Sequence, residues 1–322
     1  MKKFFFCAAA AAIVALASCS KTQIVYNDAP QEIGFKAVTG AITKAEQIGT
    51  LSGNMGVFAF VNGISDVYFA NKQFTASNNV WTGGQYWPLQ SNLDFVVYAP
   101  YGTASYTSNT LTVSDVDNTG KTTIDTQTDY MYGAEYYDDT DGKGYSEEMV
   151  ATTLKHALAK VTLHFSGSNV TVNSVSLKTP TLKGSYTVNY GTDAPAGPVA
   201  DWGEPTAETT DLQLTGINDA ELAEAVVDDP ETNDVDETAD AKTASVSIMV
   251  VPAEVSDIVV EYTVKGSSTR LSATADLDGT WDPGTHYIYN ITISPDAIQF
   301  SAPTVAGWDD DDDHDDDDIT IE

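Results

Sequence analysis

Apolar and polar side chains alternate in several short runs along the chain, which is the pattern of β-strands that bury one face. The apolar positions of these runs are Val57, Ala59 and Val61; Phe95, Val97 and Ala99; Val161, Leu163 and Phe165; Val246, Ile248 and Val250; Ile258, Val260 and Tyr262; and Tyr287, Tyr289, Ile291 and Ile293. Gly, Asn, Asp, Ser and Pro cluster between the runs, and these residues accept the backbone angles of tight turns. Many short strands joined in this way predict β-sandwiches, so we expect an all-β fold.

The length of the chain suggests two domains. Its 322 residues, of which 42% are hydrophobic, can bury two cores. We place the boundary where the acidic, Gly-containing stretch 138–148 gives way to the apolar run that begins near Leu154. The predicted β-sandwiches are then 45–153 and 154–300, and a tail follows at 301–322.

The net charge of −32 is concentrated in two segments. Residues 201–240 carry 14 acidic and no basic side chains, and residues 309–322 carry 10 acidic and no basic ones. The rest of the chain has 23 acidic against 15 basic side chains, an ordinary surface balance. We interpret 201–240 as a long surface insertion with one short helix at 219–227. Such acidity disfavours nucleic acids and anionic lipid headgroups as ligands.

The acidic runs do not have the features of a metal site. Asp309 to Asp318, interrupted only by His314, would be costly to bury without partners, so we expect a solvated tail. A flexible run does not fix the roughly six to eight oxygens that tight Ca²⁺ binding requires. Asp115 and Asp117 resemble the opening of a calcium loop, but Thr126 stands where that loop has a bidentate Glu. We interpret the run that begins at Asp115 as a turn, and we expect no metal site in the chain.

The N-terminus has the features of a lipoprotein export signal. Lys2 and Lys3 precede an apolar stretch at 4–16 that is too short to span a bilayer as a mature helix. The sequence Leu16-Ala17-Ser18-Cys19 resembles the lipobox of bacterial lipoproteins, which implies removal of residues 1–18 and a lipid on Cys19. The only other cysteine lies in the removed segment, so the mature chain has no disulfide. We expect no cofactor other than this covalent lipid.

Catalytic motifs are lacking. The chain has no Gly-x-Ser-x-Gly elbow, no Walker loop, no His-Glu-x-x-His and no Cys-x-x-Cys, so we expect no enzyme. Its histidines, at 156, 164, 286 and 314, are more typical of packing than of catalysis. A group of tyrosines leaves open a surface that binds a glycan or a protein: Tyr130, Tyr132, Tyr136, Tyr137 and Tyr145.

A series of motifs after the lipobox suggests a family. They are, in order, Ile33-Gly34-Phe35; Thr43-Lys44-Ala45; Tyr86-Trp87-Pro88; Phe95-Val96-Val97-Tyr98-Ala99-Pro100; His156-Ala157-Leu158-Ala159-Lys160-Val161; and Trp281-Asp282-Pro283-Gly284-Thr285-His286-Tyr287-Ile288-Tyr289-Asn290-Ile291. Together they resemble the fimbrillin family, the type V pilins of gut and oral anaerobic bacteria. The resemblance covers nearly the whole chain.

This resemblance implies two transthyretin-like β-sandwich domains after a lipoprotein signal peptide. It also implies an outer-membrane lipoprotein at the cell surface, assembled with other subunits into a fimbria that mediates cell adhesion. In the family, a trypsin-like protease removes the lipidated first strand, which opens a hydrophobic groove. The C-terminal strand of a neighbouring subunit then fills this groove. The matching position here is Lys44, with Ala45 as the new N-terminus and 19–44 as the removable segment. Major subunits commonly present Arg at this position, and the only arginine of this chain is Arg270.

Several apolar residues near the C-terminus could supply a donor strand. These candidates are Ile298, Phe300, Val305, Ile319 and Ile321. The leading hypothesis is therefore a structural or accessory fimbrial subunit that assembles by donor-strand exchange. The alternative is a surface glycan-binding lipoprotein built from similar sandwiches. Whether a host protein or glycan is a further partner stays open.

Overall fold

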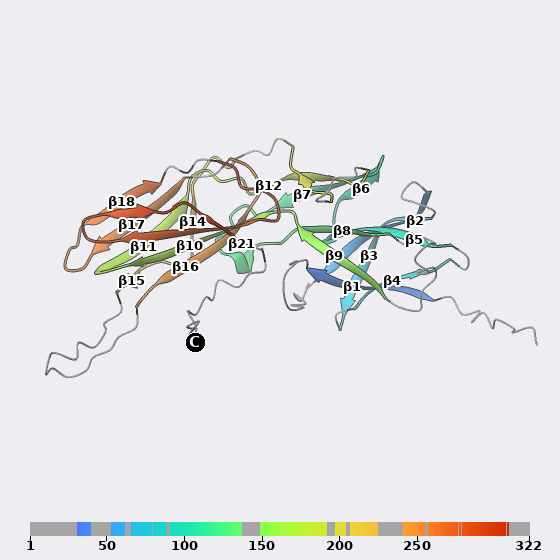
Figure 1. The fold of residues 1–322 in the computed structure, drawn as a ribbon, viewed down its shortest axis with the longest axis horizontal. Helices are drawn as coiled ribbons and strands as arrows, with labels where there is room; N and C mark the ends of the chain where they lie inside the picture. The colour runs from blue at the N-terminus through green and yellow to red at the C-terminus, as the bar shows by residue number, and fades with distance from the viewer. Residues whose placement is uncertain are drawn as a thin grey trace, which may run out of the picture.

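The computed structural model describes the chain from residue 31 to residue 308, with gaps. The described residues are 31–39, 53–61, 66–78, 80–88, 91–136, 149–191, 197–203, 207–224, 241–254, 257–275, 277, 279–306 and 308. They form 21 strands and one 3-10 helix, Ile124–Thr126 (Figure 1). No helix in this part of the chain is long and apolar enough to cross a bilayer. The predicted all-β fold is confirmed.

The N-terminal half forms a closed barrel with the strand order β1-β4-β3-β2-β5-β8-β9. Its strands are β1 (Glu32–Thr39), β2 (Asn54–Val61), β3 (Asp66–Ser77), β4 (Val80–Tyr86), β5 (Leu93–Ala99), β8 (Met131–Glu135) and β9 (Val150–His156). Alternate side chains of these strands fill the interior, which is rich in aromatic rings. β2 and β5 are buried on both faces, because a further sheet covers the outside of the barrel.

The covering sheet has the order β13-β12-β7-β6. It consists of β6 (Ala104–Thr107), β7 (Thr110–Asp117), β12 (Lys183–Asn189) and β13 (Ala200–Asp201). β7 and β12 pair antiparallel although more than sixty residues separate them in the sequence. Phe58, Phe60 and Tyr98 of the barrel pack with Tyr186 and Trp202 in the core between barrel and sheet. The covering sheet therefore joins early and late parts of the chain.

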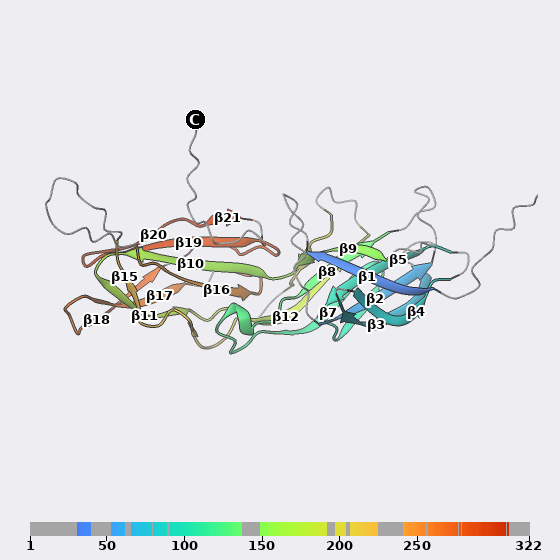
Figure 2. The same cartoon turned by 90° about the horizontal axis from the view of Figure 1, so that it is seen from below.

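The C-terminal half is a sandwich of two five-stranded sheets (Figure 2). One sheet contains β10 (Ala159–Gly167), β16 (Ala244–Val250), β19 (His286–Ile293), β20 (Ile298–Phe300) and β21 (Thr304–Ala306). The other contains β11 (Val170–Leu177), β14 (Leu212–Leu214), β15 (Ala220–Leu222), β17 (Ile258–Val264) and β18 (Arg270–Ala275). Their facing side chains form the largest apolar core of the described chain. Each of the alternating runs noted in the sequence lies in a strand, here or in the barrel.

Barrel and sandwich lie at opposite ends of an elongated molecule (Figure 1). The sequence-based boundary between 153 and 154 falls inside β9, and the chain passes from β9 to β10 at Ala157 and Leu158. β12 and β13 then return to the barrel, so the N-terminal half contains strands from beyond that boundary. The division into two tandem transthyretin-like domains stays a prediction.

The acidic segment 201–240 differs from the expected surface insertion. Its described part contributes β14 and β15 and buries Trp202, Leu214 and Leu222. The helix predicted at 219–227 is wrong at its start, because Ala220–Leu222 pairs with β11 as a strand. Leu222 reaches the sandwich core through this pairing, and tertiary packing has overridden the local preference for a helix. The rest of that segment, 225–240, lies outside the described residues.

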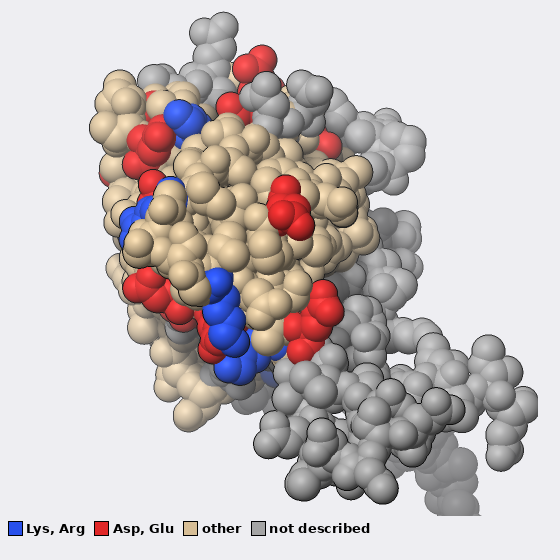
Figure 3. Space-filling model, turned by 90° about the vertical axis from the view of Figure 1, so that its left-hand side faces the viewer, with Lys and Arg blue, Asp and Glu red and all other residues tan. Residues whose placement is uncertain are grey.

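The described surface carries charges of both signs. Figure 3 shows the end of the molecule formed by the sandwich, where most of the visible described surface is uncharged and Lys, Arg, Asp and Glu are scattered over it. Exposed ion pairs join Lys242 to Glu221 at 2.9 Å and Arg270 to Glu261 at 3.1 Å. Such exposed pairs add little to stability.

Candidate functional site

β1 closes the barrel between two strands that do not pair with each other. It runs antiparallel to β4 and parallel to β9, with Phe35 opposite Trp81 on one side and Val150 on the other. At its start, the Trp87 N–H donates to the Gln31 carbonyl at 2.9 Å. Loss of β1 would leave the backbone edges of β4 and β9 unpaired.

The inward face of β1 is part of the barrel core. Ile33 and Phe35 both have 0% exposure. The Phe35 ring meets the edges of Phe74 and Phe95 at centroid distances of 5.2 and 5.1 Å. Without β1, these two rings would border an apolar groove. Ile33 and Phe35 therefore lie on the same, inward face of β1.

The residues expected to carry processing and lipidation are not described by the structure. Cys19, Lys44 and Ala45 lie outside the described residues. Their sequence positions nevertheless bracket β1, which ends at Thr39. Lipidation of Cys19 and cleavage after Lys44 therefore stay predictions, and a cut after Lys44 would separate all of β1 from the rest of the chain.

The second part of the candidate site is the C-terminal segment 298–308. β20 and β21 both pair antiparallel with β19, at its end and at its start respectively. Between them the Ser301 N–H donates to the Asn290 carbonyl at 3.0 Å, so the segment follows the whole length of β19. Ile298 and Phe300 are half-buried against the sandwich core, whereas Val305 is 62% exposed. The other donor candidates, Ile319 and Ile321, lie outside the described residues.

A cavity of about 510 Å³ lies beside this segment, lined by Thr274, Ala275, Leu277, Tyr289, Phe300, Ser301, Ala302 and Pro303. It borders β18 and the break between β20 and β21. The segment is therefore held mainly by its backbone bonds to β19 and by contacts at its two ends.

One contact at the far end joins the C-terminal segment to the barrel. The Trp308 indole stacks on the His156 imidazole at a centroid distance of 4.3 Å and an angle of 14°. His156 ends β9 and is 6% exposed, and its Nδ1 lies 2.7 Å from Asp129 Oδ2. The sequence indicated a packing role for His156 but not its partners, because Trp308 is more than 150 residues away.

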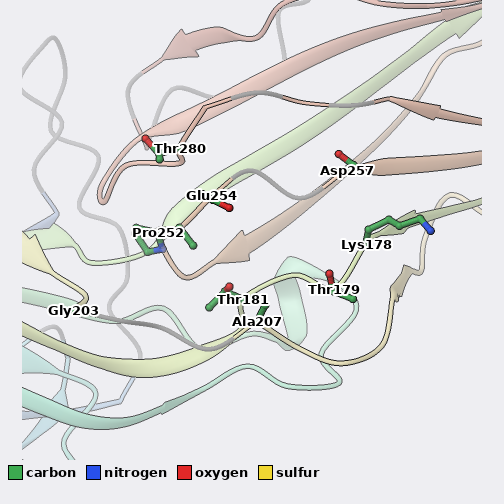
Figure 4. A pocket seen from close by; sticks show the side chains of 10 residues that line it. Lys178, Thr179, Thr181, Gly203, Ala207, Pro252, Glu254, Asp257 and Thr280 are labelled. Carbon is green, nitrogen blue, oxygen red and sulfur yellow. The ribbon is translucent and has the colours of Figure 1, made fainter.

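Figure 4 shows an open cavity of about 530 Å³ in the sandwich, lined mainly by polar side chains that include Lys178, Thr179, Glu254 and Asp257. Lys178 Nζ lies 3.8 Å from Asp211 Oδ2, a surface ion pair. Within the described chain no group of three or more His, Cys, Asp or Glu is placed to hold a metal ion. In the stretch that resembles the opening of a calcium loop, the Thr119 N–H donates to Asp117 Oδ1 at 2.8 Å, so this stretch is a hydrogen-bonded turn.

A smaller cavity of about 190 Å³ gathers tyrosines. Tyr132 and Tyr136 line it together with Tyr190, Lys155 and Pro198. Burial raises the pKa of the Tyr136 hydroxyl to about 12, although its side chain is exposed enough to meet a ligand. The structure thus brings two of the sequence-predicted tyrosines into one cavity. Tyr130 is not part of its lining, and Tyr137 and Tyr145 lie outside the described residues.

Comparison with known protein families shows which family this chain belongs to. The model of the fimbrillin-like family matches residues 36–308, from β1 to Trp308. The chain belongs to the fimbrillin-like family. No curated protein is significantly similar to this fimbrillin-like chain in sequence.

This fimbrillin-like chain shares its fold with solved structures of a fimbrial protein and a candidate cell adhesion protein. A fimbrial protein from Bacteroides vulgatus is 13% identical, with a TM-score of 0.54 over 86% of this chain and 99% of that one. A candidate cell adhesion protein from Bacteroides ovatus is 16% identical, with a TM-score of 0.53 over 87% and 98%. The fimbrial anchor protein Mfa2 from Porphyromonas gingivalis is 12% identical, with a TM-score of 0.39 over 87% and 98%.

Proposed function

We propose that this protein is a structural or accessory subunit of a type V fimbria, assembled by donor-strand exchange. The observation that carries the proposal is the position of β1. This strand closes the barrel with Ile33 and Phe35, yet it lies between a candidate lipidation site, Cys19, and a candidate cleavage site, Lys44. A single cut would remove the strand that completes the barrel.

The physical basis is β-augmentation. A barrel without β1 has two unpaired strand edges, on β4 and β9, and two empty apolar positions that Ile33 and Phe35 occupied. An incoming strand with alternating apolar residues restores both the backbone bonds and the burial. Each apolar side chain that refills such a position contributes roughly 1.5–3 kcal/mol.

The C-terminal segment has the properties of a donor. Its alternating apolar residues Ile298 and Phe300 are only half-buried on their own sandwich, and it lies at the edge of its sheet beyond β19. Moving it to a neighbour would expose little of the donor's own core. The partners are thus other fimbrial subunits.

The proposed location is the cell surface, with attachment to the outer membrane through a lipid on Cys19. Membership of the fimbrillin-like family supports a surface location, as do the similar structures of a fimbrial protein and a candidate cell adhesion protein. Family membership also argues against an enzyme.

Limited proteolysis tests the proposal directly. A soluble variant that lacks Cys19 is treated with trypsin, its new N-terminus is sequenced, and its size is followed by native chromatography. We expect a product that starts at Ala45 and forms a ladder of oligomers, while the Lys44→Ala variant stays monomeric. A product that starts at Ala45 and remains monomeric at high concentration would refute donor-strand exchange.

The tyrosine-lined cavity favours a second candidate function, the binding of a surface glycan. Sugar rings stack on exposed aromatic faces, and Tyr136, which is exposed, lines this cavity together with Lys155. In gel electrophoresis with mucin in the matrix, this function predicts retardation of the intact chain and its loss in Tyr136→Ala. Equal migration with and without mucin would exclude mucin glycans as the ligand.

A further inference from the structure

The C-terminal segment can leave its own subunit in only one direction. Its first strand, β20, follows β19 through a tight turn in which the Ser294 N–H donates to the Ala297 carbonyl at 2.8 Å. This end is covalently tied to β19 and cannot separate first. Release therefore starts at the other end, at Trp308, and proceeds through β21 toward β20.

The strand next to this end, β21, has no buried side chain. Each of β20 and β21 has three residues. Thr304 and Val305 of β21 are exposed, and the cavity of about 510 Å³ borders the break before it. Beyond β21, the Trp308 side chain packs against the core between the barrel and the covering sheet.

The partner of Trp308 is itself fixed in place. His156 ends β9, where it lies opposite Met131 of β8, and its ring is oriented by Asp129 at 2.7 Å. The indole lies nearly parallel to this ring, at 14°, so a large part of one indole face is removed from water. An aromatic contact of this kind stabilises the packed state beyond what its buried area alone contributes.

We propose that Trp308, stacked on His156, is the anchor that holds the C-terminal segment on its own subunit and must detach before the segment can be donated. The inference rests on the proposed function for its biological meaning, but the anchoring itself is a property of the single chain. Trp308 acts as a positioning residue for 304–306, and β20 is held independently by Ile298 and Phe300.

Hydrogen–deuterium exchange on the intact, uncleaved monomer tests the anchor. The reporters are those backbone amides of 304–306 that point toward β19 in the antiparallel pair. In Trp308→Ala we expect these amides to exchange about ten- to a hundredfold faster, since a local opening no longer has to break the stack. Trp308→Phe, which keeps an aromatic ring on His156, should restore most of the protection.

A matched control comes from the same segment. Val305 lies in β21 but is 62% exposed, so Val305→Ala should leave exchange nearly unchanged. Amides of β2 and β5 in the barrel should keep wild-type protection in every variant, which shows that the fold is intact. Wild-type exchange of 304–306 in Trp308→Ala would overturn the proposal.

The test separates this inference from the proposed function. Because exchange is measured on the monomer, faster exchange in Trp308→Ala supports the anchor even if trypsin-treated wild-type protein forms no oligomers. The absence of oligomers would count only against donor-strand exchange and not against the anchor. If wild-type oligomers do form, Trp308→Ala should form them faster, and an equal or slower rate would contradict the role of detachment in donation.

Discussion

Replacing Phe35 by Ala tests how much β1 contributes to the stability of the barrel. The Phe35 ring is fully buried and makes edge-on contacts with Phe74 and Phe95. Truncating a buried Phe to Ala costs about 3–5 kcal/mol, since it loses both transfer free energy and packing. A typical domain is stable by only about 5–15 kcal/mol. The variant should therefore lose a large fraction of its free energy of unfolding.

Urea denaturation provides the measurement. Tryptophan fluorescence reports on the barrel, because Trp81 and Trp87 are buried within it and Trp87 lies 5.5 Å from the Phe95 ring. The control is Lys36→Ala, the exposed neighbour on the same strand, which should change stability by less than about 0.5 kcal/mol. If Phe35→Ala and Lys36→Ala shifted the urea midpoint equally, β1 would not be an integral strand of the barrel.

Three further outcomes are expected. Gln127→Ala should cost about 1–3 kcal/mol in denaturation, because its amide makes two bonds to the backbone of Met249, at 2.7 and 2.5 Å; an unchanged midpoint would contradict this coupling of the two halves. Gly133→Ala should destabilise the barrel and lower its melting temperature, since a Cβ there would overlap the Thr153 carbonyl oxygen of β9; wild-type melting would refute this close approach. Hydrogen bonds from the Thr119 side chain and backbone lower the pKa of Asp117, so this carboxylate stabilises the fold above its unfolded pKa and loses that effect as pH falls through its lowered value. In an NMR titration, Thr119→Ala should raise the pKa of Asp117, and an unchanged pKa would contradict a contribution from the Thr119 hydroxyl.

The alternation of apolar residues was sufficient to locate much of the sheet structure. Runs such as 57–61, 161–165 and 287–293 became β2, β10 and β19, because a strand that buries one face must repeat with a period of two. This alternation could not identify β3, whose two buried side chains, Phe69 and Phe74, are five residues apart and so break the period of two.

Long-range pairing could not be predicted from the sequence. Nothing local to β7 or β12 indicates that they pair, and the expected boundary at 153 assumed that each half keeps its own strands. The stacking of Trp308 on His156 was missed for the same reason. The helix expected near Leu222 was wrong because burial in the sandwich core decided the local structure. Cys19 and Lys44, by contrast, rest on short motifs and remain predictions.

The pairing of β7 with β12 has a consequence for how the chain is made. When the first 156 residues have left the ribosome, every strand of the barrel is present. Its outer face, with Phe58 and Tyr98, is still only partly covered, because β12 and β13 end at residue 201. Until those residues have been synthesised, the barrel exposes an aromatic surface that favours aggregation. A fragment that stops after β9 should therefore aggregate, because the outer face of the barrel is completed by strands from the second half of the chain.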